Sequence, residues 1–252
     1  MLSAQTTANA TGVMLTGDFD DFYELYEAML AIIGEEGEYI EYAGARIHLL
    51  AFLYDLRHAY MGNREISLID NQMTHDIMMR QSVVTSEKNV AYSFRTVWIE
   101  MIFIVSILND FILLHAAKLA ETNNMEKMLA PKVMLDPDIA AVRRLQTAVL
   151  AEYRTMTSEE TYTQFLKSIT HFYTYFGGYM TQFIDKLSIS YINLANREER
   201  LEYLPIFIDQ IIHRTGKYPE MLIQIRQTSA LHQVPVSQIQ FDDESYPQTI
   251  DW

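Results

Sequence analysis

Cysteine is absent from this 252-residue chain. Disulfide bonds and thiolate chemistry are therefore excluded, which is typical of a protein kept in a reducing compartment. The first fifteen residues, MLSAQTTANATGVML, also lack the basic segment and following apolar stretch that mark a secretory signal peptide. We expect a cytoplasmic protein.

Basic residues are scarce. The chain has 19 Lys and Arg against 33 Asp and Glu, a formal net charge of -14. Such a charge repels phosphate backbones and anionic membrane surfaces. The closest basic pair, Arg143 and Arg144, lies in a segment with the pattern of a solvated helix. We expect no nucleic acid partner, and the ligand is a small molecule or a protein of unknown identity.

The strong catalytic motifs are missing as well. The sequence has no Gly-x-Gly-x-x-Gly, no Gly-x4-Gly-Lys-Ser/Thr, no Gly-x-Ser-x-Gly and no His-Glu-x-x-His. Nucleotide-loop enzymes, α/β-hydrolases and zincins are disfavoured. Whether the protein is an enzyme stays undecided, and no cofactor is expected.

One apolar run, Val97 to Ala117, is long enough to suggest a membrane span. It carries Glu100, Asn109, Asp110 and His115. Each central acid would cost roughly 2.5–3.5 kcal/mol in a bilayer. We therefore predict a long buried helix over about residues 89–122 and no membrane partner.

Other helices are predicted from apolar periodicity and end signals. Asp18 is placed to cap the first helix and Gly34 to end it, while Pro205 and Pro219 open the last two. The pair Gly177-Gly178 interrupts the longest of them. The predicted ranges are 19–33, 43–61, 138–155, 159–196, 206–214 and 220–231, with one or two further turns inside 71–89.

Short strands are predicted at about residues 12–16 and 64–69, and they could pair with one another. In the second, Ile66 and Leu68 would point inward, and Glu65 and Ser67 outward. Residues 236–252 form a surface tail. The predicted fold is mainly α, a single domain over residues 1–252. Six to eight helices surround one long buried helix, and a minor sheet of two or three short strands lies near the N-terminal segment.

The densest group of functional residue types lies on the second predicted helix. His48, Asp55 and His58 share one stripe there, with Arg57 beside them, because positions three and seven residues apart are neighbours on a helix. A metal site would need further ligands, and Glu100 and His115 of the long helix could supply them. The alternative interpretation is structural: buried charges pair with each other, for example Arg57 or Arg95 with Glu100 or Asp110.

Two other patterns are weaker. Arg226 and His232 fit the loose Arg-x4-6-His spacing of HEPN-type ribonucleases, but about one such match is expected by chance. Aromatic residues surround Gly177-Gly178 and could line a cleft, although core packing is the commoner role. These aromatics are Phe172, Tyr173, Tyr175, Phe176 and Tyr179.

Three stretches resemble a family of uncharacterised bacterial proteins: GDFDDFYELYEAM at 17–29, YDLRHAYMGNREI at 54–66 and NVAYSFRTVWIEMIFIVSILNDF at 89–111. The resemblance lies mainly in residues 12–111 and implies a shared fold without a known activity. The matching positions are Gly17, Asp18, Tyr54, Asp55, Arg57, His58 and Glu100.

The function expected first is non-enzymatic binding or interaction, with a regulatory role compatible with it. The expected cleft lies near Tyr54, Asp55, Arg57, His58 and Glu100, where titratable side chains concentrate. A homodimer is compatible with this hypothesis. The first alternative is a helical-bundle enzyme or metal-binding protein that uses Asp55, His58, Glu100 and His115. The second is a HEPN-like ribonuclease that uses Arg226 and His232.

Overall fold

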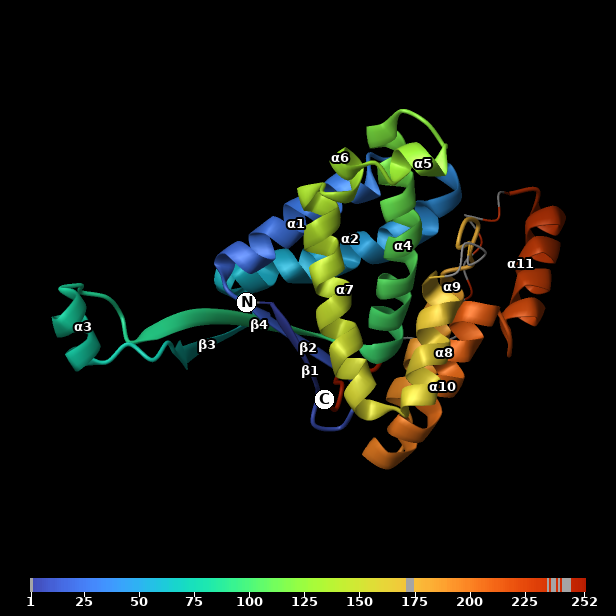
Figure 1. The fold of residues 1–252 in the computed structure, drawn as a ribbon. Coiled ribbons are helices and arrows are strands. Elements are labelled where there is room, and N and C mark those ends of the chain that lie inside the picture. The colour runs from blue at the N-terminus through green and yellow to red at the C-terminus, as the bar shows by residue number, and fades with distance from the viewer. Residues whose placement is uncertain (1, 171–174, 235, 237–238, 240, 242–245) are drawn as a thin grey trace.

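A computed structural model describes residues 2–170, 175–234, 236, 239, 241 and 246–252. The described chain is 64% helical, with eleven α-helices and one four-stranded antiparallel sheet. The predicted class, mainly α with a minor sheet near the N-terminus, is confirmed. Figure 1 shows the sheet below α1 and α2, with both chain ends close to it.

The sheet contains β1 (Ser3–Thr6), β2 (Gly12–Gly17), β3 (Glu65–Asp70) and β4 (Lys88–Val97) in the order β1-β2-β4-β3. The two predicted strands exist as β2 and β3. They do not pair with each other, because β4 lies between them and pairs with both. The expectation of two or three strands was one strand short.

The long central helix, α4, spans Trp98–Ala120 rather than residues 89–122. Its predicted first turns are strand β4, in which β-branched and aromatic residues are frequent: Val90, Tyr92, Phe94, Thr96 and Val97. This strand runs directly into the helix, so the apolar character continues across the boundary. The prediction therefore did not detect the change from strand to helix at Val97 and Trp98.

Strand β3 also differs from its prediction, since all six of its residues are exposed. Ile66 and Leu68 were expected to point inward, yet they are 55% and 62% exposed. The outer half of β4 and helix α3 (His75–Gln81) extend with β3 away from the helices as a projecting arm (Figure 1).

The first helix, α1 (Phe19–Ile33), begins and ends where its capping residues predicted. The Asp18 side chain accepts a hydrogen bond from the Asp21 backbone N–H at 2.8 Å, and the Asp21 side chain accepts from the Asp18 N–H at 3.2 Å. This reciprocal pair satisfies first-turn donors. Gly34, at φ 69°, ends the helix in a conformation that glycine adopts without strain.

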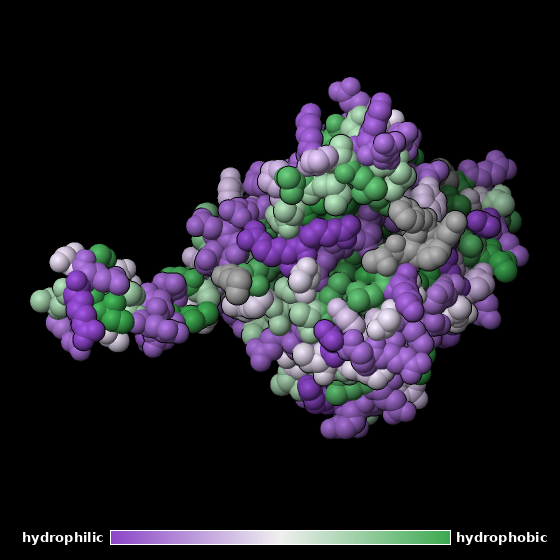
Figure 2. Space-filling view, in the orientation of Figure 1, coloured by the Kyte–Doolittle hydropathy of each residue, from purple (hydrophilic) through white to green (hydrophobic). Residues whose placement is uncertain are grey.

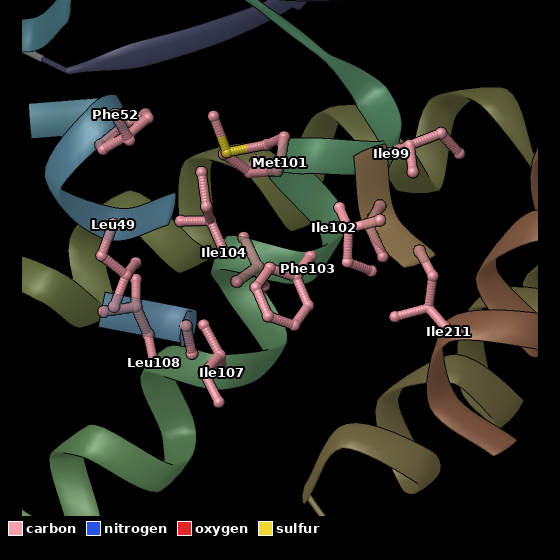
Figure 3. Close-up of a cluster of buried hydrophobic side chains, with 14 of the residues drawn as sticks. Leu49, Phe52, Ile99, Met101, Ile102, Phe103, Ile104, Ile107, Leu108 and Ile211 are labelled. Carbon is pink, nitrogen blue, oxygen red and sulfur yellow. The ribbon is translucent and has the colours of Figure 1, made fainter. Parts of the chain in front are cut away.

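The second helix, α2 (Ala43–His58), follows a short 3-10 turn at Ile40–Tyr42 and continues as one π-type turn, Ala59–Asn63. Helix α4 packs against α1, α2, α9 and α10. Figure 3 shows Leu49 and Phe52 of α2 beside α4 residues, with Ile211 of α10 on another side. Fifteen of the 23 residues in α4 are buried, among them Asp110 and His115.

Length and composition alone would allow α4 to cross a membrane, and it is the one described helix of which this holds. Its most hydropathic window is 78% buried inside the fold. Asp110 accepts hydrogen bonds from the Tyr42 hydroxyl at 3.0 Å and the Phe176 N–H at 2.8 Å. The buried carboxylate thus joins three segments of the core. The predicted ion pair with Arg57 or Arg95 is not found among the described residues, and the charge that acts on Asp110 is that of Arg214.

The second half of the chain is helical. Two single-turn helices precede α7, and Pro205 lies inside α10 instead of opening a helix at 206. The helix predicted over 159–196 is two helices, and Gly177-Gly178 lies in a turn between them. The bounds are α5 (Met125–Met128), α6 (Pro131–Met134), α7 (Pro137–Met156), α8 (Glu159–Thr170), α9 (Gln182–Ile192), α10 (Arg197–His213) and α11 (Tyr218–His232).

The described C-terminal residues return to the body of the protein. Asn9 donates to the Asp251 side chain at 2.7 Å, and the Thr11 hydroxyl donates to the Asp251 carbonyl at 2.5 Å. Trp252 and Ile250 pack against the main core. The last residues therefore form part of the fold, beside the β1–β2 turn.

Candidate functional site

A pocket of about 510 Å³ lies where α2, β4, α4, α9 and the C-terminal residues meet. One part of its lining is apolar and includes Phe52, Ile104, Ile250 and Trp252. The other part is polar and consists mostly of charged or titratable side chains. These are His48, Asp55, Arg95, Glu100, Asp185 and Tyr246.

The stripe predicted on α2 faces this pocket over most of its length. His48, Ala51 and Asp55 all line it, as their spacing of three and seven residues requires for side chains on one helix face. His58, three residues after Asp55 at the end of α2, does not line the pocket. Its ring contacts Tyr54, with 4.2 Å between ring centroids, and Nδ1 is 3.2 Å from Asn63 Nδ2.

The five residues of the predicted cleft are therefore divided by the structure. Asp55 and Glu100 line the pocket, whereas Tyr54, Arg57 and His58 lie outside it. Tyr54 is 61% exposed. The ion pairs of the lining residues differ from the predicted pairs of Arg57 or Arg95 with Glu100 or Asp110. Asp55 accepts a hydrogen bond from Arg64 at 2.7 Å, and Arg95 pairs with Glu65.

Glu100 is the centre of the polar part of the pocket. It is in the first turn of α4, at the positive end of the helix dipole, which favours a carboxylate there. Its Oε2 lies 3.1 Å from His48 Nδ1, and its Oε1 accepts a hydrogen bond from the Tyr246 hydroxyl at 3.2 Å. Glu100 thus faces the pocket and pairs with histidine and tyrosine, not with an arginine.

Asp185, on α9, completes a cluster with His48 and Glu100. One ring nitrogen of His48 and one carboxylate oxygen from each acid all lie within 4.8 Å of one another. The Asp185 carboxylate is half-buried, and no hydrogen bond or ion pair to it is found among the described residues. An acceptor group is therefore available at the pocket surface.

The cluster changes the protonation equilibria of its members. Burial, reinforced by the charge of Glu100 and opposed by His48, raises the pKa of the Asp185 carboxyl. Burial by itself would lower the pKa of His48. The hydrogen bond to Glu100 and the charges of Glu100 and Asp185 outweigh burial, so the pKa of His48 is raised. Two acids close together favour a positive charge between them.

These three residues suit a divalent metal ion. Metal–ligand bonds of about 2.0–2.2 Å place neighbouring ligand atoms roughly 3.0–3.5 Å apart, and the pair formed by His48 Nδ1 and Glu100 Oε2 is already at 3.1 Å. The carboxylate of Asp185 offers the third ligand atom, within 4.8 Å of the other two. One imidazole with two carboxylates favours first-row ions such as Zn²⁺ or Mn²⁺.

A second cluster lies at the other end of α4, where His115 meets Asp136 and Asp138. Glu100 and His115 are fifteen residues apart on one helix, about 22 Å along its axis. The alternative metal site of Asp55, His58, Glu100 and His115 therefore does not form one centre.

The two acids of the second cluster lie at the start of helix α7, and the capping role of Asp136 explains its position. Asp136 caps α7, because its Oδ1 accepts from the N–H groups of Asp138 and Ile139 at 3.1 and 3.0 Å. The same oxygen lies 3.6 Å from Nε2 of the buried His115. The contact at 3.6 Å is too long for a hydrogen bond, and both ring nitrogens of His115 are buried without a hydrogen-bond partner among the described residues.

The remaining predicted sites do not come together as a cleft. Arg226 and His232 both lie exposed on α11, six residues and about 120° apart around the helix axis. Of the aromatic run, Phe176 and Tyr179 are buried in the core and Tyr175 is 52% exposed. Phe172 and Tyr173 lie outside the described residues.

Sequence reasoning did not place three of the charged or titratable lining residues at the site. Arg95 was assigned to a helix and lies on β4. Asp185 lies on α9 directly before Lys186, and its local sequence gives no signal of a site. Tyr246 comes from the acidic tail, 146 residues from its partner Glu100, and no local pattern marks it.

Comparison with known proteins identifies the family alone. The family model described as "Domain of unknown function (DUF6904)" matches residues 2–252, so the chain belongs to that family. No curated protein and no solved structure matches the chain.

Proposed function

For this member of the DUF6904 family, we propose a binding function in which the pocket holds one divalent transition-metal ion. His48, Glu100 and Asp185 are the ligands, and the remaining space takes a small organic anion that completes the coordination. The observation that carries the proposal is the convergence of three donor atoms within 4.8 Å at the surface of a 510 Å³ pocket.

The contacts within the cluster support metal over a purely structural role. In a structural ion-pair network each buried charge has a partner. Here His48 and Glu100 are in direct contact at 3.1 Å, while Asp185 interacts with His48 through charge alone, without a hydrogen bond or close ion pair among the described side chains. A bound divalent cation would neutralise both acids and replace the proton shared by His48 and Glu100.

The shape of the pocket supports a second, organic ligand. Three protein ligands leave coordination positions open, as in metal sites that exchange ligands. The volume exceeds that of an ion with its waters, and Phe52, Ile104 and Trp252 offer apolar surface beside the cluster. A carboxylate or phosphate on an otherwise apolar molecule fits both features.

The test is calorimetric titration of the chelator-treated protein with Zn²⁺ and Mn²⁺. We expect one equivalent to bind, with affinity lowered more than tenfold in Asp185→Asn, because that change removes one ligand and keeps the side-chain shape. Asp209→Asn is the matched control. Asp209 is 2.8 Å from His213 in an exposed pair far from the pocket lining. Equal binding by wild type and Asp185→Asn would refute the proposed site.

Addition of oxalate or inorganic phosphate to the metal-loaded protein tests the organic ligand. We expect anion binding that requires the metal and disappears in Asp185→Asn. Anion binding of equal strength before and after chelation would show that the ion does not recruit the ligand.

A further inference from the structure

The arm formed by residues 64–92 stands apart from the body of the protein (Figures 1 and 2). Strand β3 pairs with β4 and with no other described strand, so its outer edge is open. None of the residues of β3 or α3 is buried. Figure 2 shows the arm joined to the body through a narrow neck.

Large apolar side chains are exposed along this arm. Val84 is 99% exposed, Met79 68% and Leu68 62%. The others are Ile66, Ile69, Val83 and Val90. Single exposed apolar residues are ordinary, but seven on one projecting element mark an interaction surface.

The two-stranded part of the arm has one apolar face. Ile66 lies opposite Tyr92, and Leu68 lies opposite Val90. Opposed residues of an antiparallel pair project to the same side, and residues two apart share a face. Ile66 and Leu68 therefore do form an apolar face, as their alternation with polar residues predicted, but no described part of the chain covers this face.

We propose that this arm joins two copies of the chain, with β3 pairing antiparallel to β3 of the partner subunit about a two-fold axis at Ser67. An open strand edge is satisfied by another strand, and an identical edge on a second copy gives the self-complementary contact of a symmetric dimer. The two sheets then form one continuous sheet across the axis.

Charge selects this register. An axis at Ser67 places Ile66 opposite Leu68 of the partner subunit and Arg64 opposite Asp70 of the partner subunit, which joins unlike charges. The neighbouring registers that keep opposed side chains on one face have their axis at Ile66 or Leu68. They place Arg64 opposite Leu68 or Gln72 of the partner subunit, so neither joins these unlike charges.

Charge also favours the arm over the body as the contact between copies. The arm has three basic residues, Arg64, Arg80 and Lys88, against four acidic ones, so it carries a net charge of only -1 out of -14. Two bodies repel each other. The nearly neutral arm is where two copies approach at the lowest electrostatic cost.

The exposed apolar area is a substantial part of what a stable dimer needs. A standard interface buries about 800 Å² on each partner. The seven apolar side chains of the arm are 43–99% exposed, so at roughly 100 Å² for a full side chain they offer about 400 Å² in all. They supply about half of that requirement, and the backbone edge of β3 adds to it.

The first experiment is the mass of the full chain in solution, by sedimentation velocity over a range of concentrations. We expect twice the 29.3 kDa chain mass for the wild type. Leu68→Lys should shift it to the monomer without loss of stability, since Leu68 is 62% exposed in one chain. Leu231→Lys, at a 78% exposed site on α11, is the control and should remain dimeric.

The second experiment uses the absence of cysteine from the chain. Ser67→Cys should form an intermolecular disulfide on oxidation, because Cα atoms opposed in an antiparallel pair are about 4.5–5.5 Å apart, within disulfide range. Ile223→Cys on α11, also an exposed site, should stay reduced under the same conditions.

Three results would overturn the proposal. The first is a wild type that is monomeric at every concentration. The second is a dimer that Leu68→Lys leaves intact, which would place the contact elsewhere. The third is a dimer that Leu68→Lys dissolves but Ser67→Cys does not crosslink, which would exclude pairing of β3 with β3.

Discussion

Replacing Glu100 with glutamine in the metal-free protein isolates the charge at the centre of the pocket. The glutamine side chain keeps the shape and one acceptor oxygen, but it no longer carries the charge that faces His48 at 3.1 Å. Both side chains are largely removed from water, at 12% and 16% exposure, so solvent screens this pair only weakly. A hydrogen bond to a charged group contributes about 1.5–3 kcal/mol.

The cost of Glu100→Gln should depend on pH. In the folded protein the pKa of His48 is raised above its ordinary 6.5. The stability from the charged pair is therefore fully present below pH 6.5 and is lost as pH rises through the folded pKa. Because glutamine still accepts a hydrogen bond, we expect a loss of about 1–2 kcal/mol at pH 5.5 and only a few tenths at pH 8.5.

Urea denaturation in the presence of chelator, at both pH values, measures these losses. Histidine NMR titration should show a lower His48 pKa in Glu100→Gln. The control, Asp209→Asn, removes a carboxylate from a His–Asp pair that is 55% and 59% exposed, and should cost less than about 0.5 kcal/mol. Equal costs for the two variants at pH 5.5, or a cost for Glu100→Gln that does not change with pH, would refute the reasoning.

Three further changes test other parts of the structure. Burial raises the pKa of the Asp110 carboxyl above its ordinary 3.8 despite its hydrogen bonds. The protonated carboxyl therefore stabilises the folded protein at low pH, and this contribution is lost as pH rises from 3.8 through the raised pKa of the folded state. Asp110→Asn should therefore gain stability relative to wild type between pH 4 and pH 7 in urea melts, and a constant difference would contradict this. Asp136→Ala should lose about 1–2 kcal/mol because it removes the α7 cap, with metal binding at the pocket unchanged in calorimetry. Gly12→Ala should lose about 1–3 kcal/mol in thermal denaturation, because a Cβ would lie 2.3 Å from the Thr96 carbonyl oxygen; an unchanged midpoint would show that β4 gives way freely.

Local signals accounted for much of the helical structure. Asp18 and Gly34 bound α1 as predicted, because capping depends on residues within one turn of the helix end. The polar residues within the long apolar stretch indicated a buried protein helix, and α4 is mostly buried. The stripe of His48 and Asp55 on α2 likewise followed from helical spacing.

Non-local pairing explains what was missed. Strand β4 is defined by its partners β2 and β3, which lie far away in the sequence, so the predicted helix was extended back across Val97 to residue 89 although the long apolar run begins at Val97. Asp185 and Tyr246 reach Glu100 from distant parts of the chain. Pro205 was taken as a helix start because proline favours that position, yet α10 begins at Arg197 with Asn196 as its cap.

The central claim is that the pocket holds a divalent metal ion, and metal binding by the chelator-treated protein tests this claim most directly. Titration with Zn²⁺ or Mn²⁺ should give one bound ion in the wild type and more than tenfold weaker binding in Asp185→Asn, while Asp209→Asn binds like the wild type. No binding by the folded wild type, or binding that Asp185→Asn leaves unchanged, would contradict the assignment of His48, Glu100 and Asp185 as ligands.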